Sequence, residues 1–91
     1  MAVVLVVDVP GMTSEVYRQA IDQVRAPLTA AQGFVAHAGT PTPDGFRVTE
    51  IWETREDCTR FLESTIIPMA QAVGLPPLQP EFFEADEAFT R

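Results

Sequence analysis

The stretch from Ala2 to Asp8 is the feature of this sequence that most constrains its fold. It reads Ala-Val-Val-Leu-Val-Val-Asp, is rich in β-branched side chains and is bounded by Pro10-Gly11, which predicts a short strand. Successive side chains of a strand point to opposite faces, so Val4 and Val6 share one face and their apolar neighbours share the other. A strand of an antiparallel sheet with one face in water should alternate with polar residues. This strand does not, so we expect it to be buried on both faces.

Strand and helix patterns alternate along the rest of the chain. Apolar residues recur at helical spacing after Thr13, a good N-cap residue, and again after Thr54, while Pro27 should kink or stop the first helix. The residues between 40 and 45 are typical of a turn and predict a hairpin. The expected elements are strands at 2–8, 34–39, 46–53 and 81–85, and helices at 14–26 and from Thr54 to Gly74.

The two halves of the chain also match at a constant offset. The matched pairs are Thr13 with Thr54, Glu15 with Glu56, Pro27 with Pro68, and Gly33 with Gly74. Each half is then strand, helix, strand, and two such units form a split βαβ arrangement. The sequence therefore predicts one α+β domain over residues 1–91, with a core at 2–85 and a tail at 86–91. Its fold is ferredoxin-like (βαββαβ), a four-stranded antiparallel sheet with two helices on one face.

Composition excludes several classes of function. The net charge is −7 and the chain has no Lys, so we expect neither nucleic acid nor an anionic membrane as a partner. Cys58 is the only cysteine, which excludes a disulfide within the chain and a Cys/His metal cluster. The apolar N-terminal run is too short for a secretory signal or a membrane span, and we expect a cytoplasmic protein.

A second subunit is the simplest cover for the second sheet face. Of the 91 residues, 46% are hydrophobic, which is a large share for a chain that buries little surface alone. Self-association would cover the face that one chain leaves open. We therefore expect a homodimer.

Three stretches give the chain a family resemblance: the turn Pro-Gly-Met-Thr at 10–13, Gly-Phe-Val at 33–35, and Glu-Ile-Trp-Glu-Thr at 50–54. Over residues 2–85 the chain resembles the dimeric α+β barrel superfamily, and within it the antibiotic biosynthesis monooxygenase-like domains. The resemblance implies a homodimer whose sheets form a barrel, and a cavity between each sheet and its own two helices. Members include cofactor-free oxygenases of aromatic polyketides or quinols, haem-degrading enzymes, and proteins without an assigned activity. The haem-degrading relatives carry a histidine near the end of the second helix, where this chain has Gln71, so we expect no haem and no other cofactor.

His37, the only histidine, is the main catalytic candidate. If residues 39 and 46 face each other across the hairpin, His37, Glu50 and Trp52 project to one side of the sheet. His37 would then accept a hydrogen bond or a proton from a phenolic or enolic substrate, and Glu50 would orient it. The alternative is a half-buried histidine satisfied by a neighbour in the sheet. A register change of one residue would put His37 and Glu50 on opposite faces.

Trp52 and Tyr17 are the candidate substrate-binding residues. Trp52 would stack on an aromatic ligand or, alternatively, be the largest core side chain. Tyr17 would point its hydroxyl into the same cavity or extend it to water. Cys58 is expected to fill the core, because the acids beside it disfavour a thiolate. Arg47 and Thr49, on the opposite face from His37, would lie in a dimer seam or in water.

These residues leave three functions open. The first is a cofactor-independent monooxygenase-like enzyme acting on a small aromatic, enolisable molecule. The second is a non-catalytic module that binds a small apolar ligand or serves as an accessory protein. The third is a polyketide cyclase-like enzyme that uses the same cavity and the same histidine without oxygen.

Overall fold

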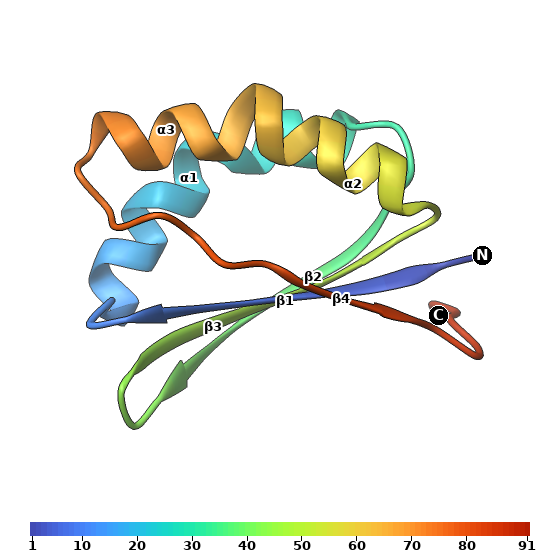
Figure 1. Ribbon diagram of the computed structural model, residues 1–91, viewed down its shortest axis with the longest axis horizontal. Helices are drawn as coiled ribbons and strands as arrows, with labels where there is room; N and C mark the ends of the chain where they lie inside the picture. The colour runs from blue at the N-terminus through green and yellow to red at the C-terminus, as the bar shows by residue number, and fades with distance from the viewer.

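The computed structural model describes residues 1–91 as one sheet with its helices on a single face (Figure 1). The strands are β1 (Val3–Pro10), β2 (Phe34–Thr42), β3 (Gly45–Trp52) and β4 (Glu81–Glu84). The helices are α1 (Ser14–Ala30), α2 (Arg55–Phe61), the π-helical turn η1 (Leu62–Ile66) and α3 (Ile67–Ala72), of which the last three run on as one rod. All pairings are antiparallel and the strand order is β2-β3-β1-β4. This confirms the predicted ferredoxin-like α+β fold.

The two halves of the repeat share the same capping structure at matched positions, a threonine N-cap before the helix and a glycine with a positive φ after it. The hydroxyl of Thr13 accepts a hydrogen bond from the Val16 amide at 3.2 Å, and that of Thr54 accepts one from the Asp57 amide at 3.1 Å. Each cap satisfies an amide that the first helical turn leaves without a partner. Gly33 and Gly74 both adopt a positive φ, of 84° and 76°, which favours glycine where a helix must end.

The two helix prolines, Pro27 and Pro68, have different effects on their helices, and the predicted end of the first helix was wrong. That helix was expected to end near residue 26, but α1 continues through Pro27 to Ala30. Pro27 lies on the exposed side, where water can satisfy the carbonyl that it leaves free, and the buried Val24 and Leu28 hold the turns around it. Pro68 lies in the first turn of α3, two residues after the π-helical turn ends at Ile66, so the predicted distortion of the second helix is present as a widened turn.

The strands are longer than the turn residues suggested. Strand β2 runs to Thr42 and β3 begins at Gly45, so the hairpin turn contains only Pro43 and Asp44. His37 pairs with Glu50, not with residue 48 as the assumed register required. The difference is two residues, which preserves the face of every side chain.

The core lies between the helices and the inner face of the sheet. Strand β1 alternates strictly, with Val3, Leu5, Val7 and Val9 buried under the helices. Val4 and Val6, on the outer face, are only half-buried, and no helix lies over that face of the sheet (Figure 1). Within one chain, β1 is therefore buried on one face only, and the expected cover of its other face by a second subunit stays a prediction.

No helix of the structure has both the length and the apolar character needed to cross a bilayer.

Candidate functional site

Four side chains form a continuous hydrogen-bonded chain on the inner face of the sheet: Tyr17, His37, Glu50 and Trp52. The Tyr17 oxygen lies 2.5 Å from His37 Nε2, and His37 Nδ1 lies 2.6 Å from Glu50 Oε2. The Trp52 indole N–H donates to Glu50 Oε1 at 2.9 Å. We name this set the polar chain. It joins all four residues that the sequence singled out for a site.

Strand alternation and pairing explain why the polar chain assembles. Glu50 and Trp52 are two residues apart on β3 and so point to the same face. His37 is the direct partner of Glu50 on the neighbouring strand β2, where paired side chains lie within reach of each other. Tyr17 comes from the helical layer, near the N-terminal end of α1, and is the last member of the polar chain.

Hydrogen-bond chemistry sets the direction of the polar chain. As a carboxylate, Glu50 only accepts, so both of its oxygens are used, one by Trp52 and one by His37. The proton of neutral His37 then sits on Nδ1, which leaves the lone pair on Nε2 to accept the Tyr17 hydroxyl. Glu50 is 7% exposed, and a carboxylate this buried requires such partners.

Burial also affects the ionisable groups around the polar chain. Burial raises the pKa of the Tyr17 hydroxyl, the Glu50 charge adds to this rise, and Arg25 partly opposes it. Tyr17 therefore keeps its proton at neutral pH. Burial, with a smaller effect of Glu50, raises the pKa of the Cys58 thiol to about 12. Cys58 is fully buried, so it is a core residue, as predicted, and not a nucleophile.

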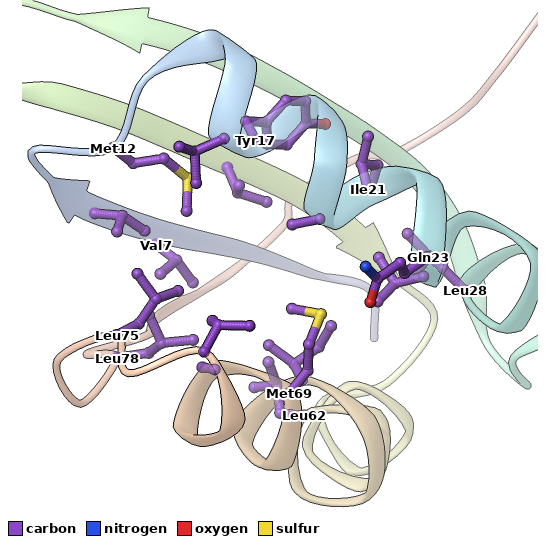
Figure 2. A pocket seen from close by; sticks show the side chains of 18 of the residues that line it. Val7, Met12, Tyr17, Ile21, Gln23, Leu28, Leu62, Met69, Leu75 and Leu78 are labelled. Carbon is purple, nitrogen blue, oxygen red and sulfur yellow. The ribbon is translucent and has the colours of Figure 1, made fainter.

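An apolar pocket of about 250 Å³ adjoins the polar chain. It lies between the inner face of the sheet and the helices, and its lining includes Tyr17, His37 and Glu50. Figure 2 shows α1 on one side, with Ile21 and Leu28, and the second helical rod on the other. Of the 22 lining residues, 18 are hydrophobic, and the other four are Gln19, Gln23, His37 and Glu50.

The position of Trp52 agrees with the core alternative. Its side chain is 0% exposed and is not among the residues that line the pocket. A ligand in the pocket therefore cannot stack on it. Phe34 and Phe61 contact the indole with ring centroids 5.6 and 5.7 Å away, and its N–H orients Glu50. The structure assigns Trp52 a supporting place in the polar chain.

Sequence reasoning missed Gly39, which lies against Tyr17. A Cβ built on Gly39 would be 2.5 Å from Cζ of Tyr17, so the ring approaches bare backbone. Phe46 stacks on the Tyr17 ring with centroids 4.3 Å apart. The available signal was a glycine two residues after a candidate histidine on the same strand face, since glycine within a strand often marks a close approach.

Met12 and Met69 are a second omission, because the sequence analysis gave neither a place in the site. They line the pocket from opposite sides, Met12 from the β1–α1 turn and Met69 from α3 (Figure 2). Methionine adapts its shape and makes favourable sulfur–aromatic contacts.

In the whole structure, no group of three or more His, Cys, Asp or Glu side chains is arranged to hold a metal ion.

Known structures share this architecture although their sequences differ. No family model and no curated protein matches the chain. Among solved structures, a proposed antibiotic biosynthesis monooxygenase from Nitrosomonas europaea matches with a TM-score of 0.73 and 16% identity, over 93% of this chain and 90% of that one. SnoaB, a cofactor-independent oxygenase from Streptomyces nogalater, matches with a TM-score of 0.68 and 17% identity, over 99% and 97% of the two chains.

A proposed antibiotic biosynthesis monooxygenase from Deinococcus radiodurans gives a TM-score of 0.67 at 17% identity, over 100% of this chain and 98% of that one. These identities carry the fold and not the activity. The coverage shows that the likeness extends over the whole domain. The predicted resemblance is confirmed at the level of structure: this chain has the ferredoxin-like α+β fold of the antibiotic biosynthesis monooxygenase-like proteins.

Proposed function

We propose that this protein is a cofactor-independent oxygenase of a small apolar molecule that carries a phenolic or enolisable group. The observation that carries the proposal is the polar chain on the wall of a mostly apolar pocket. The fold it shares with SnoaB supports the same class of reaction. Arrangements of a histidine oriented by a carboxylate are well suited to removing a proton.

Proton removal is the step that such an oxygenation requires from the protein. The substrate anion is electron-rich and passes electrons to O₂, so the substrate itself is the reductant. Overall, conversion of a CH₂ group to a carbonyl breaks two C–H bonds, the first of them by enolisation before the enol O–H gives up its proton. One oxygen atom of O₂ forms the C=O bond, and the other leaves as water. The atoms and electrons balance with O₂ alone. His37 holds the proton, and Glu50 stabilises the imidazolium that forms.

The size of the pocket bounds the substrate. Ligand pockets typically measure about 300–1,000 Å³, and this one, at about 250 Å³, is slightly smaller. It suits a compact, mostly apolar molecule. The flexible Met12 and Met69 side chains suit an aromatic surface.

Oxygen uptake with 1,8-dihydroxyanthrone as the probe tests this proposal. We expect enzyme-dependent O₂ consumption with formation of the quinone, and a loss of about 10²–10⁴-fold in kcat for His37→Ala. Thr40→Ala, on the same strand, is the control and should keep full activity. Turnover of a polyketide-like substrate without O₂ would favour the cyclase-like alternative. Tight binding of apolar aromatics with no turnover would favour the non-catalytic module.

We also propose that a second copy of the chain covers the outer face of the sheet. Proteins of this fold are typically homodimeric, and the outer face carries half-buried Val4, Val6 and Ile51 beside Phe83, which is 51% exposed. Sedimentation should give a dimer, and Val6→Lys should give a folded monomer, because a lysine there would be buried without a partner. A native chain that sediments as a monomer at micromolar concentration would contradict this proposal.

A further inference from the structure

The resting state of His37 leaves it no free nitrogen for a substrate. Nδ1 is engaged by Glu50 and Nε2 by the hydroxyl of Tyr17. The His37 side chain is only 15% exposed, and the Tyr17 and His37 rings lie nearly parallel, with an interplanar angle of 12°. A substrate that approaches from the pocket can reach Nε2 only by displacing Tyr17 or by acting through it.

Tyr17 is built to stay in place. Its ring is stacked on Phe46 and lies against the backbone at Gly39. When His37 is neutral with its proton on Nδ1, the Tyr17 hydroxyl donates to Nε2, and the Tyr17 oxygen keeps a lone pair that can accept another hydrogen bond. Tyr17 also lines the pocket. The outermost group of the polar chain is therefore a fixed acceptor and not a bare imidazole.

We propose that Tyr17 is the catalytic residue that meets the substrate and passes the substrate's proton to His37. This inference rests on the proposed function and assigns the first step of it. The O–H bond of the substrate breaks as a new O–H bond forms on Tyr17. At the same time the original O–H bond of Tyr17 breaks and an N–H bond forms on His37 Nε2.

The balance of this relay suits the site. Tyr17 is neutral before and after, the substrate becomes an anion, and His37 becomes an imidazolium next to the Glu50 carboxylate. Because burial raises the pKa of Tyr17, a free tyrosinate does not accumulate between the two transfers. No oxidant or cofactor enters this step.

The relay narrows the class of substrate. A hydrogen-bonded chain of oxygen and nitrogen atoms takes up protons from oxygen acids readily, because the proton moves along an existing hydrogen bond. The group that meets Tyr17 is therefore a phenol or an enol O–H and not a C–H bond. Gly39 is a positioning residue, since any side chain there would move the Tyr17 ring away from His37.

Tyr17→Phe separates the relay from direct proton transfer to His37. If Tyr17 relays the proton, Tyr17→Phe lowers kcat with 1,8-dihydroxyanthrone by at least about 10²-fold, and Gly39→Ala also lowers kcat while Ala38→Ser does not. If His37 acts directly, Tyr17→Phe frees Nε2 and kcat stays within about threefold of the native value. That second outcome, with His37→Ala inactive, would overturn the relay and leave the proposed function intact.

A binding experiment gives a readout that does not depend on turnover. We expect the native protein to bind 1-naphthol at least tenfold more tightly than 1-methoxynaphthalene, followed by Trp52 fluorescence, because only the naphthol donates to Tyr17. In His37→Ala this preference should persist, because Tyr17 still accepts the naphthol hydroxyl. If the preference is lost in His37→Ala, the naphthol bonds His37 directly and the relay is wrong. If the native protein shows the preference but consumes no oxygen, the proposed function fails while the placement of Tyr17 stands.

Discussion

The two faces of the sheet follow opposite rules. The inner face is sealed by the helices of its own chain, and the groups that it buries are all paired, with no buried side-chain polar atom lacking a partner. The outer face carries apolar residues that no part of the chain covers, beside an exposed ion pair between Asp8 and Arg47. One chain therefore completes only half of its sheet. The difference shows that the polar chain and its pocket lie within a single subunit, whereas no helix of that subunit covers the outer face.

Truncating one apolar side chain on each face is the most direct test of the difference between the two faces, because the two truncations should lower the free energy of unfolding by different amounts. Leu5, on the inner face, is 1% exposed, and Leu5→Ala should lower the free energy of unfolding by about 2–5 kcal/mol. Ile51→Ala, on the outer face, should cost about 1 kcal/mol or less in a single chain. Urea unfolding at low protein concentration measures both.

Measuring the free energy of unfolding of the same two variants at several protein concentrations gives a second test. If a second copy covers the outer face, the cost of Ile51→Ala grows as the concentration rises through the dissociation constant. The cost of Leu5→Ala should change little. Equal costs for both variants at low concentration would mean that the two faces do not differ.

The polar groups of β3 offer a second comparison, with an effect of similar size. Glu50→Leu leaves the N–H groups of His37 and Trp52 without an acceptor and should cost about 1–3 kcal/mol for each. Glu50→Gln keeps an acceptor for Trp52 and should cost less. Thr49→Val, one residue away on the outer face, should change the free energy of unfolding by about 0.5 kcal/mol or less. Urea unfolding followed by Trp52 fluorescence tests all three, and a cost for Thr49→Val as large as that for Glu50→Leu would contradict the comparison.

The free energy of unfolding should depend on pH through the buried thiol of Cys58, which lies under the helices. Since the pKa of Cys58 is raised from 9.0 to about 12, the native state keeps this proton where the unfolded chain has lost it. Stability from this group is full below pH 9 and is lost as the pH rises toward 12. Cys58→Ala should therefore lose less stability than the native chain over this range in urea unfolding. Parallel curves for the two proteins would contradict the assignment.

Removal of the ion pair between Asp8 and Arg47 on the outer face should have the smallest effect on the free energy of unfolding. The hydrogen bonds from Arg47, at 2.7 and 2.9 Å, hold the pKa of Asp8 below its usual value of 3.8. The stability that this pair supplies is present above that pH and is lost as the pH falls through the lowered pKa. Arg47→Gln should return the pKa of Asp8 to the usual range in a carbon-detected NMR titration. The free energy of unfolding at neutral pH should change little, because exposed ion pairs contribute little.

The sequence by itself determined which side chains share a face of the sheet. Strand alternation has a period of two, so His37, Glu50 and Trp52 project inward even though the hairpin register differs by two residues from the one assumed. The caps at Thr13 and Thr54 were also evident, because an N-cap depends on residues within one turn.

Only the tertiary structure decided what those inward residues do. The rotation of α1 against the sheet brings Tyr17 to His37, and the bare backbone at Gly39 lets its ring approach. The passage of α1 through Pro27 depends on which side of the helix is buried. These outcomes come from packing between segments far apart in the chain, and local propensity does not encode such distances.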